Sequence, residues 1–218
     1  MTRLSHHLEP GRTPPPIVLG IAGPSGSGKT TLARELCNTL GGALLPLDAY
    51  YRPLDDLPVQ ERAGRNFDHP DALEIDLLVQ QLQSLMRGRA IERPTYDFVH
   101  HTRRHGDSVH VAPCPYLIVE GILALHYPEL RALFDLSVFV EATPDLCLSR
   151  RLQRDVHERG RTAAAVREQF RTTTLPMAEQ FVLPSAAHSD LVILGSDSIA
   201  LSLDRILDEL RTRSLLRG

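Results

Sequence analysis

The order of apolar and polar positions divides most of the chain into alternating short strands and amphipathic helices. Apolar runs typical of buried strands occupy 17–22, 43–47, 116–121, 135–140 and 190–194. Between them, apolar residues recur at helical spacing, most clearly from Ile75 to Met86. Strands that alternate with helices predict an α/β fold, a mostly parallel sheet with helices on both faces.

Local signals place several helix ends. Thr143-Pro144-Asp145 combines a cap, a proline at the first helical position and an acid in the first turn, so a helix is expected from there to about Val156. Ser198 is the expected cap of a last amphipathic helix. A helix over 163–182 is expected to be interrupted near Pro176.

Two segments depart from this rhythm. Residues 53–72 are rich in Pro, Asp and Arg and are expected to be irregular, with a short helix near 59–63. Residues 90–112 are expected to form an inserted β-hairpin, with strands at 91–98 and 108–111 joined by the polar segment 99–107.

The length of 218 residues suits one domain with a well-buried core, which we expect over 17–213. Residues 1–16 hold four prolines and two histidines but no apolar segment of a secretion signal, so they are expected to be a disordered tail. The three cysteines are odd in number and widely spaced, which disfavours a disulfide framework or zinc site and suits a reducing cytoplasm.

Charge and hydropathy exclude some partners. The net charge is −3, so no overall basic field favours nucleic acid or an anionic membrane. The apolar runs are too short to span a bilayer. The predicted partners are therefore small molecules rather than nucleic acid or membrane.

A glycine-rich loop between the first strand and the first helix carries the strongest chemical signal. It has the composition and context of a phosphate-binding P-loop, in which backbone N–H groups and a helix N-terminus surround phosphate oxygens. In such a loop Lys29 reaches the β- and γ-phosphates, and the Thr30 hydroxyl binds Mg²⁺. The expected nucleotide-binding residues of this stretch are Gly23, Pro24, Ser25, Gly26, Ser27, Gly28, Lys29, Thr30 and Thr31.

Lys29 is also the only lysine in the chain, since the other 23 basic residues are arginine. A compact ammonium group fits between phosphates where a planar guanidinium does not. The retention of lysine at this position therefore supports the P-loop interpretation.

Two carboxylates follow strands that we expect beside this loop. Glu120 ends the strand over 116–120 and is a candidate Mg²⁺ ligand, although a solvated acid at a strand end is the alternative. Asp48 is a candidate general base for transfer to a hydroxyl group, and a helix-capping aspartate is the alternative. Parallel strands bring such residues to one edge of the sheet.

Two further groups of side chains point to a phosphorylated substrate and a ring. Five arginines fall within twelve residues of 150–161, where they could close over a transferred phosphoryl group as a lid or simply form a solvated face. Five of the eleven aromatic residues lie between 50 and 98, interleaved with acids and histidines, and suit a heterocycle carrying hydroxyls or an ordinary satellite core. The aromatic residues are Tyr50, Tyr51, Phe67, Tyr96 and Phe98.

From about Ile17 to Leu194 the chain resembles the uridine–cytidine kinases, relatives of phosphoribulokinase. The motifs that carry the resemblance beyond the P-loop are Asp48-Ala49-Tyr50-Tyr51-Arg52, Asn66-Phe67-Asp68-His69-Pro70-Asp71-Ala72, Pro94-Thr95-Tyr96-Asp97-Phe98, Glu120-Gly121-Ile122-Leu123, the segment 154–161, Pro176-Met177 and Glu179-Gln180-Phe181-Val182. The chain departs from the family at Ala186-Ala187-His188 and at Leu194-Gly195-Ser196, near the expected site of the donor base.

The resemblance implies roles for individual residues. Asp48 would be the base for a nucleoside 5′-hydroxyl, while Arg154 and Arg159 would face the phosphates and Arg159 would stabilise the transferred group. The nucleoside site would be lined by Asp48, Tyr51, Phe67, Asp68, Tyr96, Phe98, His101, Arg151, Arg161 and Gln169. The resemblance also implies ATP or GTP as donor, Mg²⁺ as cofactor, a homotetramer and a place in pyrimidine salvage.

The hypothesis is a kinase that makes UMP from uridine and CMP from cytidine. One alternative is a P-loop phosphotransferase with another acceptor, such as a sugar phosphate or nicotinamide riboside. The other alternative is a catalytically silent nucleotide sensor, which would have no need for the base at Asp48.

Overall fold

The computed structural model describes residues 14–62, 64–158 and 160–217, so the predicted tail over 1–16 lies almost wholly outside the described residues. The centre of the fold is a five-stranded sheet in the order β2-β5-β1-β6-β7, in which every pair of neighbours is parallel. The strands are β1 (Ile17–Ala22), β2 (Ala43–Pro46), β5 (Tyr116–Glu120), β6 (Leu136–Glu141) and β7 (Leu191–Leu194).

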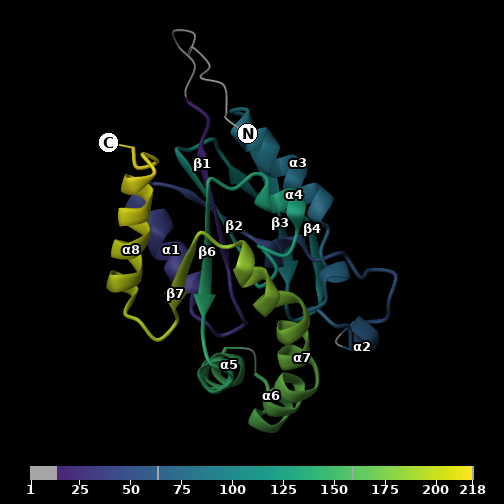
Figure 1. Cartoon of the computed structure of the whole chain (residues 1–218). Coiled ribbons are helices and arrows are strands. Elements are labelled where there is room, and N and C mark those ends of the chain that lie inside the picture. The colour runs from purple at the N-terminus through teal and green to yellow at the C-terminus, as the bar shows by residue number, and fades with distance from the viewer. Residues whose placement is uncertain (1–13, 63, 159, 218) are drawn as a thin grey trace.

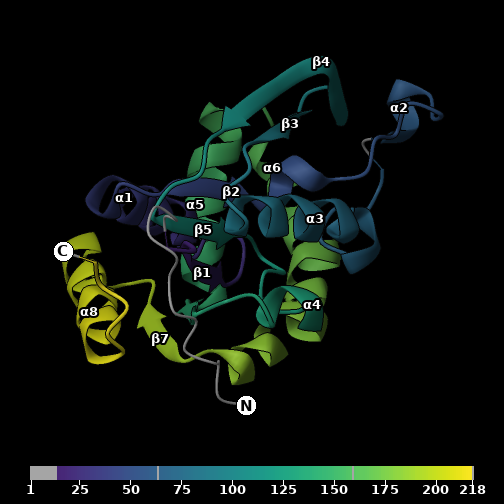
Figure 2. The ribbon, with the colours of Figure 1, turned by 90° about the horizontal axis from the view of Figure 1, so that it is seen from above.

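Helices cover both faces of this sheet (Figures 1 and 2). On one face, α1 (Lys29–Leu40) and α8 (Ile199–Thr212) pack against the side chains of Leu19 and Ile21 from β1. On the other, α3 (Ile75–Met86) and α4 (Pro128–Arg131) contribute to a second apolar cluster that includes Val18. Successive residues of a strand point to opposite faces, so β1 supplies both clusters. The predicted fold class is confirmed.

The remaining helices gather near the carboxyl edge of the sheet, the lower side of the molecule in Figure 1. They are α2 (Val59–Arg62), α5 (Pro144–His157), α6 (Ala163–Gln169) and α7 (Leu175–Met177). The predicted caps are present: the Thr143 hydroxyl accepts from the Leu146 amide at 3.4 Å, and the Ser198 hydroxyl accepts from the Leu201 amide at 3.2 Å.

Contrary to the prediction from the sequence, the helix is not broken near Pro176 but changes its winding there. The chain stays helical from Ala163 to His188 and changes its winding instead, with wide π turns over Phe170–Thr174 and Ala178–Val182 on either side of α7. A proline lacks the N–H of a regular helical turn and crowds the carbonyl four residues earlier, and a wider turn accommodates both effects. A 3₁₀ segment over Leu183–His188 ends the run.

The predicted hairpin exists, but its loop is much shorter than expected. The strands are β3 (Ile91–Asp97) and β4 (Thr102–Val111), so the polar residues 102–107 belong to a strand and the turn is 98–101. Asp97 explains the position of the turn, because its Oδ1 accepts hydrogen bonds from the amides of Val99 at 2.9 Å and His100 at 3.0 Å. The register shifts between Pro94 and Tyr96, opposite a bulge that contains Gly106.

The three cysteines are free thiols in the described structure, and only Cys147 is fully buried. Within the described ranges, no helix has both the length and the apolar character needed to cross a bilayer.

Candidate active site

The glycine-rich loop joins β1 to α1 at the carboxyl edge of the sheet. Gly26 has φ +94°, and a Cβ atom there would lie 2.5 Å from the backbone oxygen of Cys147 on α5. Gly28, at the N-terminus of α1, has φ +102°. Both positions need glycine, since other residues rarely adopt such a backbone conformation and Gly26 has no room for a side chain. The loop is therefore held close to α5.

Lys29, Thr30 and Glu120 meet just beyond this loop. Glu120 lies opposite Ile21 in the pairing of β5 with β1, so it ends the strand beside the loop, as predicted. The Thr30 hydroxyl donates to the Glu120 carboxylate, with Oγ1–Oε distances of 3.2 and 3.3 Å. The side chain of Lys29 is buried, with 8% exposed. Lys29 and Glu120 are thus buried beside the N-terminus of α1, and Thr30 is partly buried with them.

Burial raises the pKa of Glu120, and the nearby Asp48 carboxylate adds to this effect, while Lys29 and the Thr30 hydroxyl oppose it. Two carboxylates that disfavour each other's ionised form are stabilised by a cation between or beside them. The oxygen donors of Thr30 and Glu120 are of the type that Mg²⁺ prefers, and Mg²⁺ at a nucleotide usually takes only one or two carboxylates. These residues therefore fit the predicted magnesium site.

Asp48 lies on a 3₁₀ turn, Leu47–Tyr50, that directly follows β2. Complete burial raises the pKa of Tyr51 far above its ordinary value, and the nearby Asp48 carboxylate adds to this effect. Tyr51 therefore stays protonated beside this carboxylate. β2 neighbours β5, so Asp48 and Glu120 follow adjacent strands at the same edge.

A second acid, Asp68, faces the same space from the segment between α2 and α3. Its Oδ2 accepts from the Thr174 hydroxyl at 3.0 Å, and Thr174 lies in the first π turn. Burial raises the pKa of Asp68, which Arg151 and Thr174 counteract. Thr174 has no distinguishing signal in the sequence and was not predicted, because its place depends on the winding of the helix.

Five of the residues predicted to line the nucleoside site pack together and are called the aromatic cluster below. Tyr51 contacts Phe67 and Tyr96 with ring centroids 5.3 and 5.2 Å apart. Phe67 stacks on His101 at 5.2 Å with an interplanar angle of 19°, and Tyr96 contacts Phe98 at 5.3 Å. The cluster joins the strand-end segment of Asp48 to the hairpin. It consists of Tyr51, Phe67, Tyr96, Phe98 and His101.

Tyr50, the remaining aromatic residue of this group, does not share the site. It is fully buried in the apolar core, and its hydroxyl donates to Oε1 of Gln81 on α3 at 2.7 Å. For this residue the alternative of an ordinary core position is correct.

The arginines of α5 and the loop after it reach toward the P-loop and α6. Arg151 donates from Nη1 to the Ser25 hydroxyl at 2.7 Å and from Nη2 to Oε1 of Gln169 at 3.2 Å. Arg161 donates to the same Gln169 oxygen at 2.6 Å. Arg154 donates from Nε to Asp155 at 2.8 Å. The structure thus brings Arg151, Arg161 and Gln169 together, whereas Arg159 lies outside the described residues.

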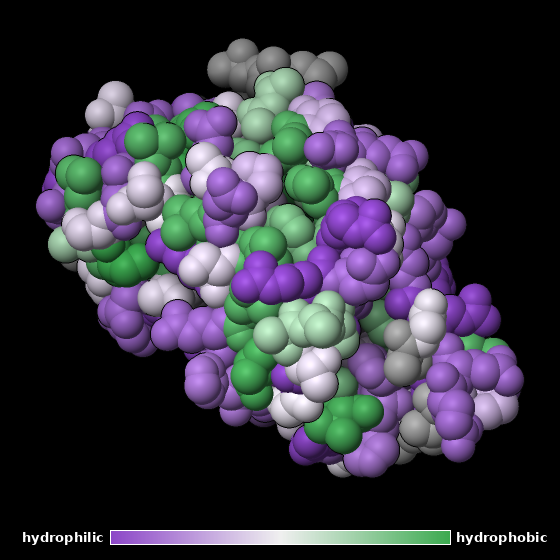
Figure 3. Space-filling view, turned by 90° about the horizontal axis from the view of Figure 1, so that it is seen from below, coloured by the Kyte–Doolittle hydropathy of each residue, from purple (hydrophilic) through white to green (hydrophobic). Residues whose placement is uncertain are grey.

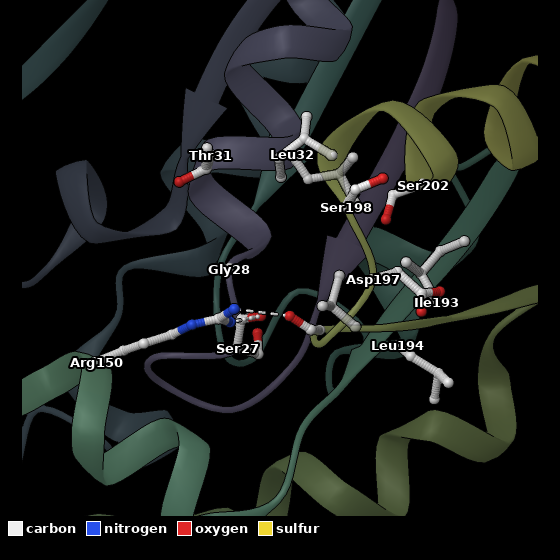
Figure 4. A pocket seen from close by; sticks show the side chains of 13 residues that line it. Ser27, Gly28, Thr31, Leu32, Arg150, Ile193, Leu194, Asp197, Ser198 and Ser202 are labelled. Carbon is white, nitrogen blue, oxygen red and sulfur yellow. Dashed lines mark hydrogen bonds between the residues drawn. The ribbon is translucent and has the colours of Figure 1, made fainter.

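A cavity of about 370 Å³ lies on the side of the P-loop away from Asp48 and the aromatic cluster (Figure 4). Arg150 lines it and joins two of its walls: Nη1 donates to the Ser27 carbonyl at 2.9 Å and Nη2 to the Gly195 carbonyl at 2.8 Å. No local pattern assigns this role to Arg150, because Ser27 and Gly195 lie 123 and 45 positions away along the chain. The other lining residues are Gly28, Thr31, Leu32, Val140, Ile193, Leu194, Asp197, Ser198, Ile199 and Ser202.

The candidate site therefore has two sides that meet at the P-loop. The cavity beside Arg150 lies on one side, and Asp48, Asp68 and the aromatic cluster lie on the other. Figure 3 shows the molecule from this edge, where hydrophilic side chains cover much of the surface and apolar ones gather in smaller groups.

A parallel sheet with a glycine loop at the end of its central strand, followed by Lys29 and Thr30 on a helix, defines a P-loop nucleotide-binding protein. The model of the Phosphoribulokinase / Uridine kinase family matches residues 18–199. The chain belongs to this family of kinases.

Curated relatives match nearly the whole chain. The uridine kinase of Halobacterium salinarum is 44% identical over 194 residues, which cover 88% of this chain and 86% of that protein. The uridine kinase of Ligilactobacillus salivarius is 40% identical over 205 residues, covering 91% of this chain and 96% of that protein.

Solved structures of P-loop kinases share the fold. Phosphoribulokinase from Rhodobacter spheroides matches with a TM-score of 0.61 at 15% identity, over 85% of this chain and 74% of that one. D-glycerate 3-kinase from Cryptococcus neoformans matches with a TM-score of 0.58 at 20% identity, over 80% of this chain and 82% of that one. At these identities the likeness concerns the fold alone.

Proposed function

We propose that this kinase transfers the γ-phosphoryl group of ATP or GTP to the 5′-hydroxyl of uridine and cytidine, giving UMP and CMP for pyrimidine salvage. The observation that carries the proposal is the aromatic cluster, which adjoins Asp48 through Tyr51. Relatives named uridine kinase at 44 and 40% identity support the same acceptor.

The aromatic cluster suits a planar base, and the acids beside it suit a ribose. Stacking on aromatic rings holds any base, whereas hydrogen bonds distinguish one base from another. A neutral His101 ring carries one donor and one acceptor nitrogen, so it can face either O4 of uracil or the 4-amino group of cytosine. Asp68 would accept hydrogen bonds from the ribose hydroxyls, as Thr174 now donates to it. A bare sugar phosphate would use fewer rings and more cations.

In the proposed reaction Asp48 accepts the proton of the 5′-hydroxyl. The oxygen then forms a bond to the γ-phosphorus, the bond from that phosphorus to the bridging oxygen breaks, and the nucleoside diphosphate leaves with the electron pair. The protonated Tyr51 hydroxyl beside Asp48 would orient this carboxylate for the proton transfer. Catalysis rests on positioning and on charge stabilisation.

On the phosphate side, Lys29 and the loop from Gly23 to Thr31 would hold the phosphates. Thr30 and Glu120 would hold Mg²⁺, which when bound neutralises phosphate charge. Arg151, Arg154 and Arg161 would lie against the phosphates and the nucleoside, with Gln169 orienting two of them. Arg159 keeps its predicted role in stabilising the transferred group. We propose that 150–161 acts as a lid on the single domain over 17–213.

The cavity beside Arg150 would receive the purine of the donor. Its volume of about 370 Å³ lies in the range of small-molecule sites. Serine hydroxyls and backbone groups line it together with Leu32 and Ile193, a mixture that suits a purine carrying polar edges. A lining of this kind would accept either adenine or guanine.

We also propose that the chain works as a homo-oligomer, a tetramer by its resemblance, in the cytoplasm. Val192, Leu194 and Leu201 are 40–49% exposed on the edge strand β7 and on α8, and self-association would cover them. Light scattering coupled to size-exclusion chromatography measures the assembly directly. A monomer at micromolar concentration would contradict this part of the proposal.

The deciding experiment is an acceptor panel with ATP–Mg²⁺, followed by ADP release and by chromatography of the product. We expect turnover with uridine and cytidine within about tenfold of each other, since roughly 1.4 kcal/mol spans that range. Deoxynucleosides should be poor acceptors, because they leave Asp68 partly unpaired. Turnover only with ribulose 5-phosphate, D-glycerate or nicotinamide riboside would show that the acceptor is not a pyrimidine nucleoside. Nucleotide binding without any turnover would indicate a sensor.

A further inference from the structure

One acid stands among the arginines of the candidate site. Asp155, on α5, has 0% of its surface exposed. Its Oδ1 accepts from Arg154 Nε at 2.8 Å, while Arg151 Nη2 and Arg161 Nη1 lie 3.7 and 3.8 Å from its Oδ2. A fully buried carboxylate is stable only when it is paired, so these arginines are held around it.

Two of these arginines also contact other elements of the candidate site. Arg151 reaches Ser25 in the P-loop, and Arg151 and Arg161 share the Gln169 oxygen on α6. Through these two arginines, Asp155 is connected to the P-loop, to the loop after α5 and to α6. Its carboxylate is thus at the centre of a network rather than at one end of a single ion pair.

The sign of this charge is informative. The Asp155 carboxylate by itself repels the phosphates of a nucleotide, so any favourable effect it has on them must come through the arginines around it. Three guanidinium groups around one carboxylate leave an excess of positive charge for the phosphates to occupy. What Asp155 supplies is an arrangement of long side chains that exists before the substrates bind.

We propose that Asp155 is a positioning residue that orients Arg151, Arg154 and Arg161 toward the transferred phosphoryl group, at the expense of nucleotide affinity. The inference rests on the proposed function for the identity of the reaction. It assigns to Asp155 an effect on the chemical step rather than on nucleotide binding.

The test is Asp155→Asn, which keeps the size and an acceptor oxygen for Arg154 but removes the charge. We expect kcat to fall by about tenfold or more, as when a preorganised charge contact is lost in the transition state. The Kd for ATP–Mg²⁺, measured by isothermal titration calorimetry, should stay equal or become smaller. The matched control is Asp145→Asn, which removes an exposed acid from the first turn of the same helix and should change neither quantity.

A purely structural role predicts another result, in which kcat and ATP affinity fall together with the melting temperature. That result, or a wild-type kcat in the variant, would overturn the proposal. If Asp155→Asn yields no folded protein, Asp155→Glu decides, because it keeps the charge and shifts it by one methylene. Lower kcat with unchanged Kd would support positioning, and wild-type kcat would refute it.

A double-mutant cycle measures the coupling between Asp155 and Arg154 in kcat, which a general loss of stability would not produce. If Asp155 acts through Arg154, Asp155→Asn should cost much less kcat in an Arg154→Gln background than in the wild type. If the decreases in kcat of the two single variants simply multiply in the double variant, Asp155 does not act through Arg154. The kcat is measured with whichever acceptor the wild type uses, so a wild type inactive on uridine refutes the proposed function and leaves the test of Asp155 intact.

Discussion

At the scale of single residues, the candidate site is built from charges that the fold has removed from water. Glu120 and Asp155 are buried acids, and Lys29 and Arg151 are buried bases with 8% and 6% exposed. Such groups are costly without partners and are typical of sites where charge must be stabilised during a reaction. Their substitution should therefore separate activity from stability.

Asp48→Asn should lower kcat by about 10²–10⁴-fold, the usual effect of removing a general base. The amide keeps the shape of the side chain but cannot accept the proton. Uridine binding, measured by calorimetry, should change little, and Asp76→Asn on the exposed side of α3 is the control. Near-normal turnover would remove Asp48 from this role.

Glu120→Gln should make the ligand-free protein more stable while it abolishes activity. Because the pKa of Glu120 is raised in the folded state, its contribution to stability is greatest below the unfolded value of about 4.3 and is lost as pH rises through the folded value. The variant avoids this loss. Its melting temperature should exceed that of the wild type at pH 8 by about 2–4 °C, the effect of ~1 kcal/mol in a chain of this size.

The difference in melting temperature between Glu120→Gln and wild type should shrink as the pH falls to 5. Glu141→Gln is the matched control, since Glu141 ends β6, on the other side of β1 in the same sheet, but is exposed. A Glu120→Gln variant that melts below the wild type at pH 8 would mean that the buried carboxylate stabilises the ligand-free fold.

At the scale of elements, the structure follows the sequence wherever the signal is local. Strands beside the P-loop and the capped helices α5 and α8 were predicted closely, because an apolar run or a Thr or Ser cap is written in adjacent residues. Residues 102–107 were misjudged since the hairpin projects from the sheet and lacks the alternation of a half-buried strand. The π turns and the contacts of Arg150 depend on packing between distant segments, which no local pattern encodes.

Asp97→Ala should disturb the hairpin turn and leave the core intact. The Asp97 carboxylate binds the amides of Val99 and His100, and its hydrogen bond from the His100 ring at 2.9 Å helps to hold its pKa well below the usual range. Loss of these bonds should loosen the turn that presents Phe98 and His101. The KM for uridine should rise by less than about tenfold, or ~1.4 kcal/mol, with little change in kcat.

The control for the hairpin is Asp107→Ala, an exposed acid on β4 away from the turn. Its KM should match that of the wild type. Equal KM values in Asp97→Ala and wild type would show that the turn does not position the aromatic cluster for binding.

At the scale of the whole molecule, one reactive amine is available for chemical labelling apart from the N-terminus, because Lys29 is the only lysine of 218 residues. We expect slow acylation of its buried side chain and a further decrease with ATP–Mg²⁺, whose phosphates would occupy its surroundings. Peptide mapping after treatment with an N-hydroxysuccinimide ester measures both states. The N-terminal amine serves as internal control, and equal labelling of Lys29 with and without nucleotide would count against the P-loop assignment.

The strand order also constrains how the chain is made. β1 is synthesised early, yet its neighbours in the sheet are β5 and β6, and the pairing of Ile17 with Tyr116 joins residues roughly 100 positions apart. At a translation rate of about 5–20 residues per second, β1 waits for about 5–20 s before its first neighbour has been made. During that interval its apolar side chains have no sheet to enter. The strand that ends in the P-loop is therefore the segment of the nascent chain that most needs shielding by the ribosome or by a chaperone.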